Sequence, residues 1–291
     1  IQGGRRDVGQ SLVQHPMIKA VGFTGSLAGG RALFDLCAAR HEPIPFFGEL
    51  GSVNPMFILP QAMEARAEAI ATGWAGSLTM GAGQFCTNPG IAVVLDEPQA
   101  DQFTKVMAGA LEKVASQVML TPGIAQAYHD GVARMTASNS VETVFAGVSE
   151  GRSAAPALFQ TTAARFMADH SLAAEVFGPL GLIIRAGSVA EMLALAKGFE
   201  GQLTATLHMD AGDLDAALPL RRVLEHKAGR VLVNGFPTGV EVVDSMVHGG
   251  PYPASTNFGA TSVGTLSIRR FLRPVAYQNM PADLLPVDLA R

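Results

Sequence analysis

Cys86 is the residue whose type and surroundings most directly suggest chemistry. It lies in the glycine-rich stretch 81–90, after Gly-Gln-Phe and before Thr-Asn-Pro-Gly. Glycines let the backbone approach a ligand and expose N–H groups that can stabilise an oxyanion. A thiolate in such a loop can act as a nucleophile, although a cysteine tolerated in a turn fits the composition equally well. Cys37 instead stands among apolar residues at 33–38, and we expect it in a hydrophobic core.

Glu49 is the candidate base. It follows two phenylalanines and Gly48 in a segment, 46–49, that has the composition of a loop. A carboxylate beside aromatic bulk and flexible backbone is expected to have a raised pKa and to move enough to act as a general base. An ordinary solvated loop glutamate is the alternative, and the residues near Glu49 alone favour it.

The turn Thr24-Gly25-Ser26 is a candidate ligand site because a predicted strand ends there and a helix begins. Ligands bind at this edge of open α/β sheets, and a helix N-terminus favours polar or anionic groups. Simple capping of the helix by Ser26 is the alternative reading. The sequence contains no Gly-x-Gly-x-x-Gly and no metal-ligand spacing among its seven histidines, so we expect no metal site.

Four short motifs resemble, in order, those of the aldehyde dehydrogenase superfamily. They are Phe-Thr-Gly-Ser at 23–26, Glu-Leu-Gly-Ser at 49–52, Gly-Gln-Phe-Cys at 83–86 and Glu-Val-Phe-Gly-Pro at 175–179. The resemblance covers essentially all 291 residues. Within the superfamily, the segments 83–90 and 249–256 are similar to a branch that includes α-ketoglutaric semialdehyde (2,5-dioxovalerate) dehydrogenases and bacterial fatty-aldehyde dehydrogenases.

The resemblance implies a mechanism. The Cys86 thiolate attacks an aldehyde and forms a thiohemiacetal, hydride passes to NAD or NADP, and Glu49 activates the water that hydrolyses the resulting thioester. In the family, the glutamate of the last motif contacts the nicotinamide ribose and the phenylalanine packs on the ring. The implied cofactor-binding residues are Thr24, Gly25, Ser26, Leu50, Glu175 and Phe177. Val233-Asn234 and the late glycine-rich loop are expected near the substrate pocket.

Two departures from the family pattern bear on activity. Ser52 replaces the second glycine of the Glu-Leu-Gly-Gly motif. The family's first part carries most of the cofactor domain, an oxyanion-hole Asn and a Lys that meets the adenosine ribose, and none of it precedes Ile1. We therefore expect this chain alone to be inactive and the intact protein to oxidise aldehydes.

Two other functions remain open. Cys86 paired with a histidine such as His248 would suit a hydrolase or acyltransferase, but nothing in the sequence places a histidine near Cys86. A non-catalytic assembly fragment is the third reading, and an inert Cys86 thiol would favour it.

Strand–helix alternation along the chain predicts an α/β fold with an open, mostly parallel sheet and helices on both faces. We expect strands at 20–24, 56–59, 91–95, 141–145, 182–184, 203–207, 231–233 and 265–269. Ser188 and Asp213 are predicted helix caps. The predicted organisation is an aldehyde-dehydrogenase-like one: the end of a cofactor domain at 1–48, a catalytic domain at 49–252, and a C-terminal loop and strand for oligomerisation at 253–291.

Composition limits the partners. The chain has a net charge of −4, so a basic surface for nucleic acid or anionic membranes is not expected, and no apolar run approaches the roughly 20 residues of a membrane span. Two cysteines make neither a disulfide framework nor a zinc motif, which favours a cytoplasmic setting. The resemblance adds an aldehyde substrate and a homo-oligomer, a dimer or tetramer. Arg5, Arg6 or the late loop would meet a substrate carboxylate.

Overall fold

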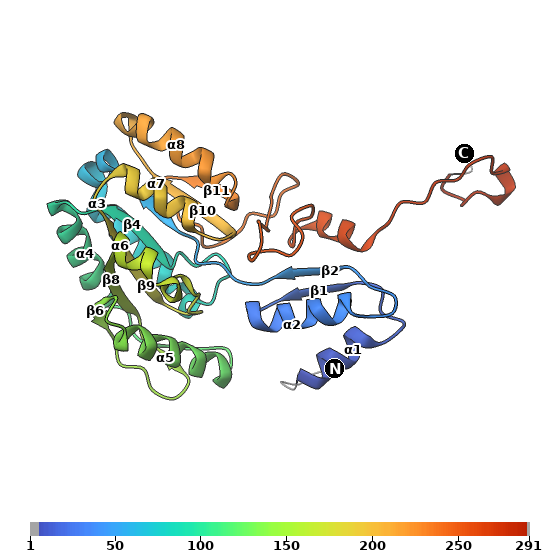
Figure 1. Ribbon diagram of the computed structural model, residues 1–291, viewed down its shortest axis with the longest axis horizontal. Coiled ribbons are helices and arrows are strands. Elements are labelled where there is room, and N and C mark those ends of the chain that lie inside the picture. Colours follow the sequence, from blue (N-terminus) through green and yellow to red (C-terminus); the bar gives the residue numbers. More distant parts are fainter. Residues whose placement is uncertain (1–5, 290–291) are drawn as a thin grey trace.

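The computed structural model describes residues 6–289, so Arg5 and its predicted contact with substrate lie outside the described residues. The chain forms a small α/β unit followed by a larger one, and its C-terminal segment runs away from both (Figure 1). The two units meet at the strand ends that carry the predicted site.

The small unit contains helix α1 (Arg6–Gln14), strand β1 (Val21–Thr24), helix α2 (Leu27–Ala38) and strand β2 (Phe46–Glu49). β1 and β2 pair in parallel, with Thr24 opposite Glu49 at their carboxyl ends. The prediction that 46–49 forms a loop is therefore wrong. Cys37 is 1% exposed in the apolar core of this unit, which confirms its structural role.

The larger unit contains a seven-stranded sheet in the order β11-β10-β3-β4-β9-β8-β6. All neighbouring strands pair in parallel except β6 and β8. The strands are β3 (Met56–Ile58), β4 (Ile91–Leu95), β6 (Glu142–Ala146), β8 (Ala157–Thr162), β9 (Leu180–Ala186), β10 (Gln202–His208) and β11 (Ala228–Val233). A small separate ladder joins β5 (Gln117–Val118) to β7 (Ser153–Ala154).

Helices cover both faces of the large sheet. Successive side chains of its central strands point to opposite sides, so both faces carry apolar side chains that the helices bury. Met56 of β3 packs into the core shared with α3 (Pro60–Thr79) and α4 (Pro98–Leu111). Phe57, the next residue, packs into the opposite core. That core includes residues of α5 (Pro122–Ala137), α6 (Ala163–Ala168), α7 (Val189–Gly198) and α8 (Leu214–Leu224). The predicted fold class is confirmed.

The predicted caps at Ser26 and Ser188 are confirmed, whereas the Asp213 side chain does not cap its own helix, α8. The hydroxyls of Ser26 and Ser188 accept from the backbone N–H groups of Gly29 and Glu191 at the starts of α2 and α7. The Asp213 carboxylate precedes α8 but accepts from the first N–H groups of α3, at Gln61 and Ala62. It therefore caps a helix distant in sequence, whose own N-cap, a leucine, has no side-chain acceptor.

The C-terminal segment contains no strand near 265–269; a 3₁₀ helix (Thr265–Phe271) replaces the predicted one. An isolated apolar stretch forms a strand only where a neighbouring strand can accept its hydrogen bonds. Further upstream, the segment returns to the small unit, where Thr256 donates its N–H to the Gly48 carbonyl and Ser255 forms a single bridge with Glu49. Within 6–289, no helix is both long and apolar enough to span a bilayer.

His208, at the carboxyl end of β10, predicts a pH dependence of stability. The ring is 2% exposed and neither nitrogen has a hydrogen-bond partner. Burial, with the nearby Arg66 charge, lowers its pKa from 6.5 to about 4. Because the unfolded chain binds the proton more readily, stability present above pH 6.5 is lost as the pH falls through 4.

We expect His208→Leu to remove this loss. Relative to wild type, the variant should gain about 2 kcal/mol in free energy of unfolding between pH 7 and pH 5. Denaturant titrations at the two pH values measure it, with the exposed His41→Asn as control. A variant that loses stability on acidification in parallel with wild type would contradict the assignment.

Candidate active site

The predicted catalytic residues gather between the two units. Glu49 ends β2 at the carboxyl edge of the small sheet, and Cys86 lies just before β4 at the amino edge of the large sheet. Gly25 at the end of β1 donates its N–H to the Glu49 carbonyl. The four motifs, distant in sequence, thus meet at one place because each follows or precedes a strand at these facing edges.

The Cys86 loop is set by a left-handed turn. Gly81, Ala82 and Gly83 all have φ near +60°, at 57°, 58° and 66°. At position 83 only glycine fits, since a Cβ there would overlap the backbone of Gly178. The third and fourth motifs therefore pack against each other backbone to backbone. The side-chain amide of Gln117 supports the turn by accepting from the Ala82 N–H and donating to the Thr79 carbonyl.

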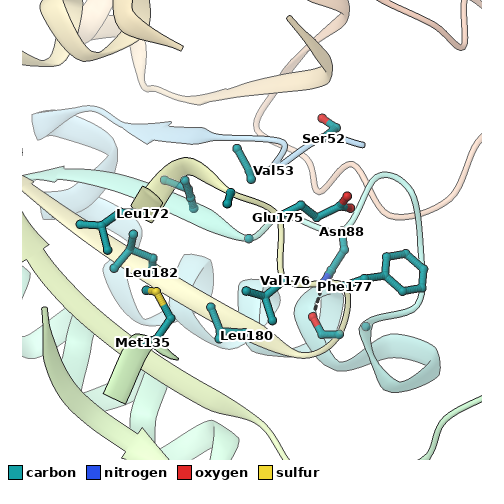
Figure 2. A pocket seen from close by; sticks show the side chains of 15 residues that line it. Ser52, Val53, Asn88, Met135, Leu172, Glu175, Val176, Phe177, Leu180 and Leu182 are labelled. Carbon is teal, nitrogen blue, oxygen red and sulfur yellow. Dashed lines mark hydrogen bonds between the residues drawn. The ribbon is translucent and has the colours of Figure 1, made fainter. Parts of the chain in front are cut away.

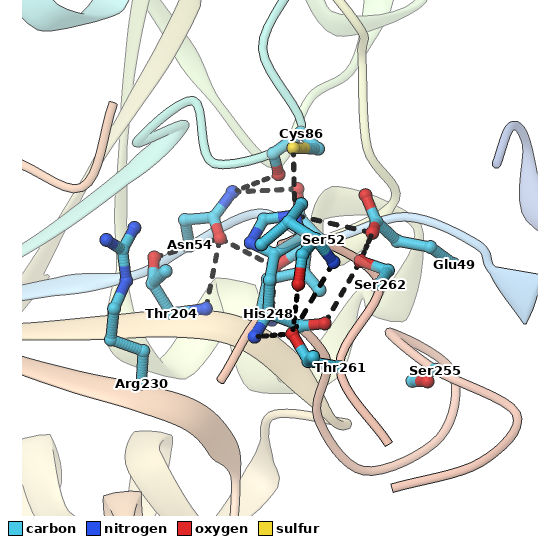
Figure 3. A network of polar contacts seen from close by, with 12 residues as sticks. Glu49, Ser52, Asn54, Cys86, Thr204, Arg230, His248, Ser255, Thr261 and Ser262 are labelled. Carbon is cyan, nitrogen blue, oxygen red and sulfur yellow. Dashed lines mark hydrogen bonds and ion pairs between the residues drawn. The ribbon is translucent and has the colours of Figure 1, made fainter. Parts of the chain in front are cut away.

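Cys86 contacts His248, which in turn contacts Glu49 (Figure 3). The Cys86 Sγ–His248 Nε2 distance is 3.2 Å and the His248 Nε2–Glu49 Oε2 distance is 3.3 Å. The Ser262 hydroxyl donates to the same Glu49 oxygen at 2.6 Å. Sequence reasoning named His248 only in an alternative function and saw no reason for it to approach Cys86; that expectation is wrong.

The contacts of His248 with Cys86 and Glu49 determine which side chains of the site are charged. Burial disfavours the charged ring of His248, but hydrogen bonds to Cys86 and Glu49 and their charges prevail and raise its pKa to about 9. Burial would raise the pKa of Glu49, but the hydrogen bonds from His248 and Ser262 outweigh it and lower that pKa. The prediction of a raised Glu49 pKa is therefore wrong. At neutral pH the site therefore contains an imidazolium between the Cys86 sulfur and the Glu49 carboxylate.

The backbone at Cys86 can also serve a developing oxyanion. Among residues 6–289, no acceptor receives the Cys86 N–H in a hydrogen bond. The Cys86 side chain itself is partly exposed, in contrast to the buried thiol of Cys37. An open N–H beside an accessible sulfur is the arrangement that stabilises an oxygen anion formed by attack of that sulfur on a carbonyl.

A buried polar network ties the Glu49 segment to the Cys86 loop. The Asn54 side-chain amide donates to the carbonyls of Cys86 and Asn88, while its oxygen accepts from Thr204. Gln202 accepts from the N–H groups of residues 53 and 54. Ser52, the departure from the family motif, contributes its hydroxyl to the Asn54 and Gln202 oxygens and accepts from a backbone N–H of β10. The serine thus anchors this segment where glycine has no side chain to do so.

Removing the Asn54 bridge should be costly. Asn54 has φ 47°, so Asn54→Gly keeps a tolerated backbone while it deletes every side-chain bond. Because buried partners lose their bonds, we expect the free energy of unfolding to fall by about 2–4 kcal/mol. Asn279→Gly, at an exposed asparagine with φ 54°, is the matched control for the backbone effect. Equal losses in both variants would show that the bridge contributes little.

A cavity of about 300 Å³ lies between the start of α2 and the larger unit, lined by Leu50 and Gly51 next to Glu49. Three predicted cofactor residues line it: Ser26, Leu50 and Glu175. The Leu50 side chain is 1% exposed and packs against Gly30, so its backbone faces the cavity. The Glu175 carboxylate lies over Gly51, whose φ of 134° requires glycine. The exposed Thr24 and Gly25 adjoin Ser26 at the end of β1.

Glu175 and Phe177 also border a smaller hollow of about 30 Å³ on the side of β9 (Figure 2). The Asn88 amide donates to the Gly178 carbonyl there and fixes the segment that carries both residues. The Phe177 ring is 36% exposed and so is free to meet a ligand. Although Glu175 keeps contact with solvent, the groups packed around its carboxyl and the nearby Glu49 charge raise its pKa to about 7.

Asn234 was expected beside the substrate pocket, and the structure places it elsewhere. It follows the carboxyl end of β11, the edge of the large sheet opposite Cys86, and bonds to Met209 and Arg66. The glycine-rich loop that follows β11 does lie beside Cys86, because its residue His248 contacts the Cys86 sulfur. Sequence reasoning missed Asn54, Gln202 and Ser262 as site residues, because their spacing carries no signal.

The comparison with known proteins decides the family. A model described as the aldehyde dehydrogenase family matches residues 1–272. The chain belongs to the aldehyde dehydrogenase family. Alpha-ketoglutaric semialdehyde dehydrogenase 2 of Azospirillum brasilense is 50% identical over 289 residues, covering 99% of this chain and 55% of the relative. Alpha-ketoglutaric semialdehyde dehydrogenase of Acinetobacter baylyi is 45% identical, covering 96% and 54%.

Solved structures agree on the fold. Gamma-glutamyl-gamma-aminobutyraldehyde dehydrogenase from Burkholderia cenocepacia superposes with a TM-score of 0.75 at 20% identity, covering 90% of this chain and 52% of that one. The aldehyde-dehydrogenase-like fold predicted from the motifs is confirmed. This aldehyde dehydrogenase chain spans about half the length of the curated relatives it matches.

Proposed function

We propose that this chain carries the nucleophile and base of an NAD- or NADP-dependent dehydrogenase that oxidises α-ketoglutaric semialdehyde or a related aldehyde to its acid. The observation that supports it most directly is the contact of Cys86, His248 and Glu49 beside an open backbone N–H. The substrate follows the two relatives at 50% and 45% identity, which are named for that semialdehyde.

The chain's own groups account for the covalent steps. The imidazolium of His248, 3.2 Å from the sulfur, stabilises the Cys86 thiolate, which attacks the aldehyde carbon. The Cys86 N–H receives the thiohemiacetal oxyanion. After oxidation to the thioester, a water molecule attacks the acyl carbon while Glu49 accepts a proton from that water. The carbon–sulfur bond then breaks, which releases the acid and regenerates the Cys86 thiolate. Ser262 keeps the Glu49 oxygen oriented throughout.

A nicotinamide cofactor, when bound, would accept the hydride that leaves the thiohemiacetal carbon. The cavity of about 300 Å³ and the glycine backbone at 51 fit the nicotinamide half of such a molecule. Ser26, Leu50 and Glu175 would hold it there, with Thr24 and Gly25 beside Ser26, and the exposed Phe177 ring would be available to contact it. We infer that the oxidised dinucleotide enters from this side and the aldehyde from the side of the late loop.

A cofactor-dependent assay tests the proposal. We expect the protein expressed over its full reading frame to reduce NAD or NADP in the presence of α-ketoglutaric semialdehyde. A simple aliphatic aldehyde of equal chain length, which lacks the carboxylate, should react less efficiently. No reduction of either dinucleotide by the full protein in the presence of this aldehyde would contradict the proposal.

The Cys86–His248 contact favours a second candidate, a thiol hydrolase or acyltransferase. That enzyme would cleave activated esters and thioesters as its main reaction and would leave free aldehydes untouched. Nicotinamide-independent turnover of thioesters, combined with no aldehyde oxidation by the full protein, would support it over the dehydrogenase.

We further propose a homo-oligomer in the cytoplasm, to be checked by light scattering of the full protein and by cell fractionation.

A further inference from the structure

The three catalytic side chains form a donor set that matches a transition-metal site. Cys86 Sγ, His248 Nε2 and Glu49 Oε2 all lie within 4.8 Å of one another. Thiolate, imidazole and carboxylate are the three ligand types that zinc binds in proteins. Their wide separation in sequence hides this set from any search by ligand spacing, since 162 residues separate Cys86 from His248.

The distances suit a tetrahedral ion. Zinc bonded at about 2.3 Å to sulfur and about 2.0–2.2 Å to nitrogen and oxygen holds its donor atoms roughly 3.3–3.6 Å apart. The Cys86–His248 and His248–Glu49 separations are 3.2 and 3.3 Å. These two separations already suit the ion, and the Cys86–Glu49 separation, which is within 4.8 Å, would close to this range by rotation of the Glu49 side chain.

The surroundings also meet the requirements of a metal site. His248 and Glu49 have side chains only 3% and 7% exposed, while Cys86 is partly open and provides an entry path. The Ser262 hydroxyl donates to the Glu49 oxygen and orients it, the role that hydrogen-bond partners of metal ligands play elsewhere. Three protein donors leave a fourth position for water.

We propose that the Cys86–His248–Glu49 cluster binds one Zn²⁺ or similar transition-metal ion, and that the bound ion silences the Cys86 nucleophile. Binding forms Zn–S, Zn–N and Zn–O bonds, displaces water from the ion and releases the proton held by the His248 imidazolium. No electron is transferred. The sulfur lone pair that would attack a carbonyl is then engaged by the metal, and Glu49 no longer accepts a proton from water.

Metal binding without substrate or cofactor tests this site. The full-length, metal-free protein is titrated with Co²⁺, whose thiolate bond gives a charge-transfer absorption in the near ultraviolet, and then with Zn²⁺ in competition. We expect one ion per chain and protection of Cys86 from iodoacetamide, reversed by a chelator. Cys86→Ala should abolish the absorption and weaken Zn²⁺ binding at least about 100-fold, and His248→Asn or Glu49→Gln at least about tenfold.

Cys37→Ala and His226→Asn, at the other cysteine and at an exposed histidine, are the matched controls and should bind as wild type does. Zn²⁺ binding that survives in Cys86→Ala, or alkylation of Cys86 that Zn²⁺ does not slow, would overturn the proposal. Because no aldehyde or nicotinamide is present, these results do not depend on the proposed dehydrogenase activity. Conversely, failure of the metal-free protein to oxidise aldehydes would contradict the proposed dehydrogenase activity and leave the metal-binding proposal unaffected.

Discussion

Cys86→Ala is expected to lower kcat/KM for aldehyde oxidation by the full-length protein by about 10⁴-fold or more. Alanine removes the sulfur that forms both covalent intermediates, and its methyl group offers no nucleophile in place of that sulfur. The backbone N–H for the oxyanion and the cavity on the side of the small unit remain in place. Binding of the nicotinamide cofactor, measured by fluorescence, should therefore persist within about threefold while turnover is lost.

Cys37→Ala is the matched control for this experiment. Cys37 is 1% exposed within the core of the small unit and touches none of the catalytic side chains. The substitution deletes a buried sulfur and should reduce stability by about 1–2 kcal/mol with little effect on kcat. Comparable residual activity in the two alanine variants would remove Cys86 from the reaction and favour the reading in which the chain is an assembly fragment.

The sequence predicts six of the seven strands of the large sheet. Residues 91–95 show why, since β4 is a continuous apolar run that is covered on both faces and needs no polar alternation. The prediction misses β8, although this strand pairs with both β9 and β6. Residues 46–49 have a glycine and loop composition, yet they form β2 because β1 offers a parallel neighbour. Residues 265–269 have strand composition, yet they form a 3₁₀ helix and pair with no strand among residues 6–289.

The juxtaposition of Cys86 and Glu49 was predictable because two local motifs resemble those of the family, whereas the electrostatics of the site were not. The glycines around these two residues do not single them out; the resemblance of the motifs does. His248 reaches Cys86 through a long loop of little regular structure, and no local pattern predicts such a contact. Without that histidine the pKa of Glu49 was expected to rise; with it, the pKa is lowered. The sign of a pKa shift depends on the nearest charge, which only the folded chain supplies.

His248→Asn is expected to lower kcat/KM of the full-length protein by about 10²–10³-fold and to slow alkylation of Cys86 at pH 7 by at least about tenfold. Asparagine keeps a polar side chain but cannot provide the positive charge that stabilises the thiolate. Raising the pH should recover part of the alkylation rate in the variant, because Cys86 is then deprotonated without the help of the imidazolium charge. The ratio of wild-type to variant rates, measured with iodoacetamide from pH 6 to 10, reports this directly.

The same substitution has a signature in stability, whose direction follows from the raised pKa of about 9. A histidine that binds its proton more tightly when folded stabilises the protein fully below its unfolded pKa of about 6.5, and this contribution disappears as the pH rises through 9. The stability lost in His248→Asn should therefore be largest near pH 6 and smallest near pH 9.5, while the exposed His226→Asn shows no such trend. A pH-independent loss would mean that His248 acts by packing alone. The thiolate would then lack its charged partner, and a neutral Cys86–His248 hydrogen bond would have to account for any reactivity of the sulfur.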